Sequence, residues 1–116
     1  MSLMSFFSEF NELTARNPLN NRESVWDNAV ALEVQPFDGC VRLSNIRSLR
    51  PGQGDGTRAL LWLMALADKH DVFITGAAKP TGAKRLTKTA LKSWYRRHDF
   101  AVSSKGEIRY TPAGRK

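Results

Sequence analysis

The stretch from Leu49 to Asp68 most constrains what this chain can fold into. Glycines occupy the alternate positions 52, 54 and 56 near its start, and an apolar stripe with helical spacing follows them. A strand-like segment, residues 40–46, precedes it, so the unit is expected to be strand, glycine turn and helix. The first amides of a helix lack backbone partners and lie at the positive end of its dipole, which predicts a phosphate or pyrophosphate site. Short glycine motifs also match by chance, and an ordinary glycine-rich loop is the alternative.

The composition is that of one globular domain over residues 1–116, with 41% hydrophobic and 25% charged residues. No apolar run approaches the ~20 residues of a membrane span, so no membrane partner is expected. Cys40 is the only cysteine, which excludes an internal disulfide and a multi-cysteine zinc site, and no metal is expected. A reducing, cytoplasmic setting fits this composition best. The fold prediction leaves out the residues before Met4.

The formal net charge is +7, and most of the excess lies from Lys79 onward. Such a surface attracts nucleic acid or a small ligand that carries several phosphates. A basic face that contacts only solvent is the alternative.

Hydrophobic periodicity and turn residues predict an α+β chain with one parallel contact in a mainly antiparallel sheet. The expected helices cover residues 5–15, the apolar stretch after the glycine turn, and 86–98, with Thr87 as the cap if the last helix starts late. One or two helical turns are expected over 23–28. The expected strands cover residues 29–36, 40–48, 72–75, 100–103 and 107–111, and the tail 112–116 is expected to fray.

Two motifs in this order resemble the GNAT superfamily of acyl-CoA-dependent N-acetyltransferases, in a short form. Residues 50–61, RPGQGDGTRALL, are similar to the family's acyl-CoA pyrophosphate loop, an Arg or Gln followed by Gly-x-Gly/Ala and a Leu-rich helix. Residues 91–100, LKSWYRRHDF, are similar to the family's Leu-Tyr-x-x-x-Gly-Phe, and their Trp-Tyr pair is similar to small phage proteins of this kind. The chain departs from the pattern at Pro51, Lys88 and Asp99, which replace an Arg or Gln, an Asn and a Gly.

The resemblance implies a GNAT-like, mostly antiparallel sheet flanked by helices, with a glycine-loop helix crossover and a V-shaped splay between the central strands. The family's first strand is expected to be missing or vestigial. The implied co-substrate is acetyl-CoA, with its pantetheine arm along Asn45, Ile46 and Arg47. Its pyrophosphate would lie on the turn formed by Gln53, Gly54, Asp55, Gly56, Thr57 and Arg58. Arg85, Lys88 and Lys92 would meet its 3′-phosphate or only solvent.

The implied activity is transfer of an acetyl group to a primary amine by direct attack. Tyr95 is the expected general acid, because a tyrosine pKa near ~10 keeps the hydroxyl protonated at neutral pH; a core aromatic is the alternative. Glu33, predicted on the strand face opposite Val30, Leu32 and Val34, is a candidate to relay the amine proton. A lone strand glutamate is more often a solvated surface residue.

The amine acceptor is expected to be a small molecule or a protein, and the chain a monomer or homodimer. The alternative function is a small basic module that binds nucleic acid or protein without catalysis, as a GNAT-like regulator. Nucleic acid is less favoured, because the sequence shows no zinc spacing, no RNP-type aromatic strand and no evident recognition helix.

Overall fold

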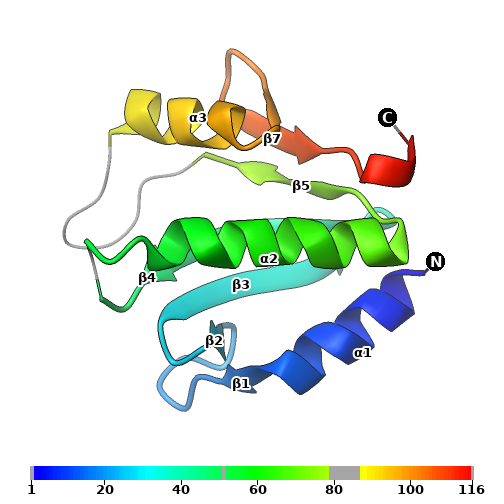
Figure 1. Ribbon diagram of the computed structural model, residues 1–116, viewed down its shortest axis with the longest axis vertical. Helices are drawn as coiled ribbons and strands as arrows, with labels where there is room; N and C mark the ends of the chain where they lie inside the picture. The colour runs from blue at the N-terminus through cyan, green and yellow to red at the C-terminus, as the bar shows by residue number, and fades with distance from the viewer. Residues whose placement is uncertain (1, 51, 79–86, 116) are drawn as a thin grey trace.

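The computed structural model describes residues 2–50, 52–78 and 87–115. In these ranges the chain has an α+β fold with three α-helices and one seven-stranded sheet (Figure 1). The helices are α1 (Leu3–Leu13), α2 (Asp55–His70) and α3 (Lys88–Arg97), with a 3-10 turn η1 (Ala113–Arg115) near the end. The strands are β1 (Thr14–Arg16), β2 (Ser24–Trp26), β3 (Val30–Phe37), β4 (Cys40–Ser48), β5 (Ile74–Ala77), β6 (Ala101–Val102) and β7 (Glu107–Tyr110).

The sheet order is β1-β2-β3-β4-β5-β7-β6, and every pairing is antiparallel except β4 with β5. The single parallel contact follows from the α2 crossover and confirms the prediction. The β3–β4 hairpin is also confirmed: Asp38 and Gly39 have φ of 54° and 75°, as a two-residue turn that matches strand twist requires. None of the described helices combines the length and hydrophobicity that a membrane span needs.

The parallel ladder between β4 and β5 is short. It joins Val41–Leu43 to Ile74–Gly76, whereas β4 continues to Ser48. Gly76 marks the end of the close approach, because a Cβ there would collide with the carbonyl oxygen of Leu43. Beyond this point, within the described residues, the β4–β5 ladder stops, and β4 continues from Ser44 to Ser48 past its end.

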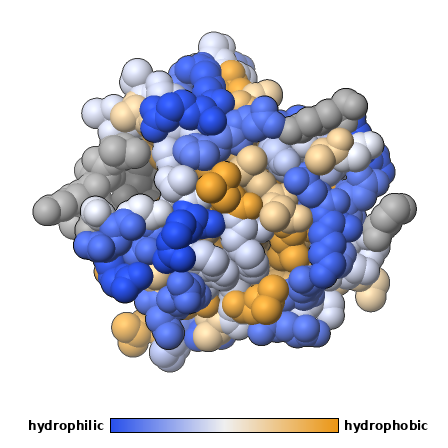
Figure 2. Space-filling view, viewed as in Figure 1, coloured by the Kyte–Doolittle hydropathy of each residue, from blue (hydrophilic) through white to orange (hydrophobic). Residues whose placement is uncertain are grey.

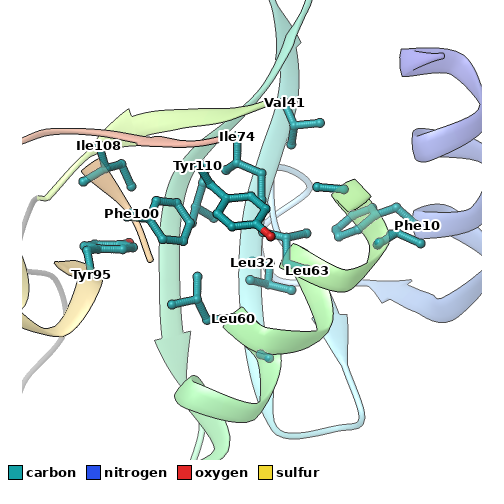
Figure 3. Close-up of a cluster of buried hydrophobic side chains, with 14 of the residues drawn as sticks. Phe10, Leu32, Val41, Leu60, Leu63, Ile74, Tyr95, Phe100, Ile108 and Tyr110 are labelled. Carbon is teal, nitrogen blue, oxygen red and sulfur yellow. The ribbon is translucent and has the colours of Figure 1, made fainter. Parts of the chain in front are cut away.

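The core lies between the helices and one face of the sheet. Phe6 and Phe10 from α1, Leu60 and Leu63 from α2, and Tyr95 from α3 belong to one buried cluster with the inward side chains of the strands (Figure 3). Strand register puts Leu32, Val41, Ile74, Ile108 and Tyr110 on this face. All three described helices therefore cover the same side of the sheet.

The opposite side of the sheet, here called the open face, has no helix over it in the described part of the chain. Register places Glu33, Arg42, Thr75 and Arg109 on it, because they alternate with the core residues. The face assigned to Glu33 from the sequence is therefore correct.

The N-terminal third corrects two expectations. Ser2, which the fold prediction leaves out, caps α1: its hydroxyl accepts a hydrogen bond from the Ser5 amide at 3.0 Å. The helix ends at Leu13 and β1 follows. The segment expected as helical turns forms β2, because pairing with β3 and stacking of Trp26 on Trp62 at 5.5 Å outweigh its local helical pattern. Two three-residue strands thus precede β3, where none was expected.

The C-terminal part corrects two more. β5 begins at Ile74 rather than at residue 72 and ends at Ala77, two residues beyond the expected end at 75. The tail is tied down rather than frayed, because the Ala113 amide donates to Asp68 Oδ1 at 2.7 Å and Arg115 pairs with Asp71 at 3.1 Å. Thr87 does cap α3, accepting from the Ala90 amide at 3.1 Å.

Candidate active site

The glycine turn ends β4 and starts α2. Gly54 is the N-cap of α2 and has φ 73° and ψ 11°, a left-handed conformation that glycine adopts without steric cost. The first backbone bond of the helix runs from the Arg58 amide to the Gly54 carbonyl at 3.2 Å. Among the described residues, the amides of Gly54 to Thr57 donate to no backbone carbonyl outside the helix. They form the unpaired, positive end of α2.

The space around this turn is open. A Cβ built on Gly52, Gly54 or Gly56 would meet no atom of the described residues within 4 Å. Gly52, Gln53 and Gly54 are exposed, and Gly56 and Thr57 are partly exposed. The predicted binding residues 53–58 are thus brought together at one accessible helix end, where an anion can approach the amides.

Asp55 lies in this turn with its side chain 2% exposed. Its carboxylate accepts from Arg58 Nη2 at 2.6 Å and from Arg50 Nε at 3.0 Å. These hydrogen bonds, first from Arg58 and then from Arg50, lower the pKa of Asp55. The two guanidinium groups are half exposed, so they are held beside the amides with donors left for a ligand. Arg58 also lies over the Trp26 ring at 5.3 Å.

The predicted pantetheine segment lies on the part of β4 beyond the β5 ladder. Ser44 is the extra residue of a bulge, since Glu33 pairs with Asn45 and Val34 with Leu43. Ile46 points toward the core, and Asn45 and Arg47 point to the open face.

The side chains of Asn45 and Arg47 meet a carboxylate that sequence analysis did not single out. Glu23 is 2% exposed and accepts from Arg47 Nε and Nη2, both at 2.9 Å. Asn17 Nδ2 donates to it at 3.0 Å and Asn45 Nδ2 at 3.4 Å. The bond from Arg47 is the main cause that lowers the pKa of Glu23 and raises that of Arg47. Both carboxylate oxygens of Glu23 are occupied, so its role is structural.

Tyr95 lies on α3, buried to 3% exposure between aromatic neighbours. Its ring is 5.0 Å from Trp94 and 5.2 Å from Phe100. Burial raises the pKa of the Tyr95 hydroxyl above its usual value, which keeps the group protonated. Asp99, which replaces the family's glycine, has φ 71°, as expected from its tolerance of the left-handed region.

A hydrogen bond joins α3 to the glycine turn. The Trp94 indole Nε1 donates to Thr57 Oγ1 at 3.1 Å. Because Thr57 is in the first turn of α2 and Trp94 precedes Tyr95, this contact fixes the helix that carries the hydroxyl against the helix end that carries the amides.

The two predicted catalytic residues are not brought together. Glu33 is partly exposed at the β4 bulge on the open face, whereas Tyr95 packs on the helix side. Of the predicted 3′-phosphate contacts, Lys88 is exposed and Lys92 Nζ donates to the Ser104 carbonyl at 3.0 Å. Arg85, Lys79 and the departure at Pro51 lie outside the described residues.

Two features of the site were missed in the sequence, for different reasons. The Asp55–Arg58 pair has the i, i+3 spacing of a helical ion pair and could have been found. Glu23 and Arg47 are 24 residues apart in the sequence and lie on either side of β3. No local signal marks such a contact. Within the described residues, no three His, Cys, Asp or Glu side chains cluster as a metal site.

Comparison with known proteins identifies a similar fold but no protein family. No protein-family model and no curated protein sequence matches the chain. Among solved structures, the chain is similar to the anti-CRISPR protein AcrVA5, with a TM-score of 0.62 and 15% sequence identity. The match covers 72% of this chain and 92% of AcrVA5. What the two proteins share at this identity is the fold.

Proposed function

We propose that this chain is a GNAT-like N-acetyltransferase that binds acetyl-CoA at the glycine turn and transfers the acetyl group to a primary amine. The observation that carries the proposal is the start of α2, with backbone amides that lack partners among the described residues, open space around three glycines, and two arginines held beside them. These groups fit a pyrophosphate: amide donors, a helix dipole and two cations in one accessible place.

The part of β4 beyond the β5 ladder fits the rest of the co-substrate. Pantetheine contains amide groups, which can pair with backbone groups along the edge of a strand. The edge from Ser44 onward starts where β5 leaves β4, and it runs toward the glycine turn. Asn45, Ile46 and Arg47 hold this edge in place through the Glu23 network and the core.

When bound, acetyl-CoA supplies an acetyl group on a thioester, which a neutral amine can attack directly. The chain's own residues orient the two reactants and transfer protons. Tyr95 is the proton donor to the leaving sulfur, and its burial keeps the hydroxyl protonated at neutral pH. Glu33 acts on the amine proton only if the acceptor reaches the reaction centre from the open face, since that is the side on which Glu33 lies.

Two assays test the proposal. Acetyl-CoA that binds only the folded chain should raise the melting temperature, by about 2.7 kcal/mol of stabilisation at a hundredfold excess over Kd. A panel of amines, assayed for release of free CoA thiol, should then contain an acceptor. AcrVA5 is an anti-CRISPR protein, so purified proteins of CRISPR systems belong in the panel beside small amines and polyamines.

The possible outcomes separate the candidate functions. Thiol release that depends on an acceptor supports the acetyltransferase. A rise in melting temperature without turnover on any acceptor favours the non-catalytic GNAT-like regulator. No response to acetyl-CoA in either assay contradicts the proposal.

A further inference from the structure

A row of polar side chains crosses the open face at one level. Thr75 on β5 pairs in register with Arg42 on β4 and with Arg109 on β7, so the three side chains point to the same side from adjacent strands. Adjacent strands are ~4.8 Å apart, which puts the two arginine backbones about 10 Å from each other. Gln35 and Ala101 extend the row to β3 and β6.

The two arginines of this row differ from those near the glycine turn. Arg47, Arg50 and Arg58 each pair with a carboxylate, whereas Arg42 and Arg109 make no ion pair with any described residue. Each lies over an aromatic ring instead: Arg42 is 5.2 Å from the centre of Phe37, and Arg109 is 4.5 Å from that of Phe73. Their charges are therefore available to an external anion.

The surface also offers stacking area. Phe37 is 56% exposed at the end of the hairpin, although a residue of this kind is normally buried. Guanidinium groups without an ion pair, next to the exposed ring of Phe37 and the partly exposed ring of Phe73, are groups on which unstacked bases can lie, while the charges meet phosphates. An acidic peptide would use the charges but not the rings.

We propose that the row Arg42–Thr75–Arg109, together with Phe37, binds single-stranded nucleic acid. The two arginines contact phosphates and present their planes to bases, Thr75 donates or accepts a hydrogen bond between them, and Phe37 stacks a base at the edge. This surface is on the other side of the sheet from Tyr95 and is built from residues other than those of the glycine turn. The proposal stands independently of acetyl transfer.

The test is fluorescence anisotropy with labelled oligo-uridine and oligo-thymidine of about ten nucleotides. Titrations at about 50 and 200 mM salt give the salt slope, which is about −0.7 per phosphate contact for single strands. The variant Arg42→Gln/Arg109→Gln should bind at least tenfold more weakly, with a slope smaller by about 1.4. The variant Arg42→Lys/Arg109→Lys keeps the positive charges but loses the planar guanidinium groups that can stack on bases. Its affinity should therefore fall, while its salt slope stays near that of the unaltered chain.

The matched control is Arg96→Gln/Arg97→Gln, which removes the same charge from exposed positions of α3 on the helix side. This control should bind nearly as the unaltered chain does, and saturating acetyl-CoA should not displace the oligonucleotide. Equal loss in the control and the row variant, displacement by acetyl-CoA, or no binding at 50 mM salt would overturn the proposal. Tighter binding of poly-glutamate than of either oligonucleotide would also overturn it, in favour of an acidic protein partner. Comparison of the two oligonucleotides assigns the natural ligand to RNA or DNA.

Discussion

At the scale of single residues, the buried polar side chains of the candidate site differ in the partners that the described part of the chain gives them. Asp55 and Glu23 are buried carboxylates, but arginines occupy both of them. Tyr95 is buried too, and its hydroxyl bonds to no described side chain, while Tyr110 donates to Asp68 at 2.8 Å. This difference supports the proton-donor role proposed for Tyr95, whereas the hydrogen bond of Tyr110 to Asp68 supports a structural role.

Replacing Tyr95 by phenylalanine should lower turnover about 10²- to 10⁴-fold and leave the KM for acetyl-CoA nearly unchanged, because only proton donation is lost. The ring volume and its contacts with Trp94 and Phe100 stay. In the unaltered chain, any turnover should not fall between pH 8 and about 9.5 through ionisation of this tyrosine, since its pKa is raised above ~10. Thiol release over this pH range measures both the loss of turnover in the variant and the pH dependence of the unaltered chain. Unchanged turnover in the variant would remove Tyr95 from the mechanism.

Replacing Glu23 by glutamine should lower the free energy of unfolding at pH 7 by roughly 1 to 3 kcal/mol, because Arg47 loses its charged partner. The pKa of Glu23 is lowered by folding, so its contribution is complete above its ordinary value of 4.5 and is lost as the pH falls through the folded value. The unaltered chain should therefore lose more stability than the variant on acidification below about pH 4.5. Urea unfolding of the unaltered chain and the variant, at pH 7 and below about pH 4.5, measures this difference in stability.

Glu107→Gln is the control for that experiment, since Glu107 is exposed and its side chain makes no ion pair with a described residue. If Glu107→Gln and Glu23→Gln behave alike in urea, the network around Glu23 does not stabilise the fold.

At the scale of elements, two glycines show where the fold needs two backbone segments to lie close together and where it does not. Gly76→Ala should destabilise the chain by about 1 to 3 kcal/mol, because the new methyl group collides with the Leu43 carbonyl where β5 pairs with β4. Gly56→Ala should instead raise stability by roughly 0.5 to 1 kcal/mol, since residue 56 is helical and a Cβ there meets open space. Thermal unfolding of the two variants compares them directly. Equal melting temperatures would show that the close approach at Gly76 relaxes freely.

The docking of α3 on α2 depends on the bond from Trp94 to Thr57. Trp94→Phe and Thr57→Val should each cost about 1 kcal/mol of unfolding free energy, and the double variant about as much as either single variant. As a control, the unfolding free-energy changes of Trp94→Phe and of Thr89→Val, an exposed position of α3, should add in the double variant. Additive costs for the first pair would mean that the bond does not couple the two helices.

Local patterns predicted the elements that local physics decides. The hairpin follows from Asp38-Gly39, α2 from its apolar stripe, and the cap of α3 from Thr87. The strand β2 was mistaken for helical turns because its three residues acquire strand geometry only by pairing with β3 and by packing Trp26 on Trp62. The tail was expected to fray because nothing local reveals its bonds to Asp68 and Asp71.

At the scale of the whole molecule, the one-sided arrangement of helices separates the two proposed sites onto opposite sides of the sheet. The helix side carries the core, Tyr95 and the glycine turn, and its apolar surface is broken into small areas among polar groups (Figure 2). The open face carries Glu33 and the arginine row. The sequence predicted the position of the turn, since its residues are contiguous. It could not predict the open face, because that surface combines residues of five strands that only register aligns.

The central claim is that the amides at the start of α2 bind the pyrophosphate of coenzyme A. Titration of ¹⁵N-labelled protein with CoA, followed by amide chemical shifts, tests it most directly. We expect the largest shifts at the amides of residues 53–57, and the same amides should respond to inorganic pyrophosphate at higher concentration. Shifts that leave residues 53–57 unchanged while others move, or no shifts at all, would contradict the account.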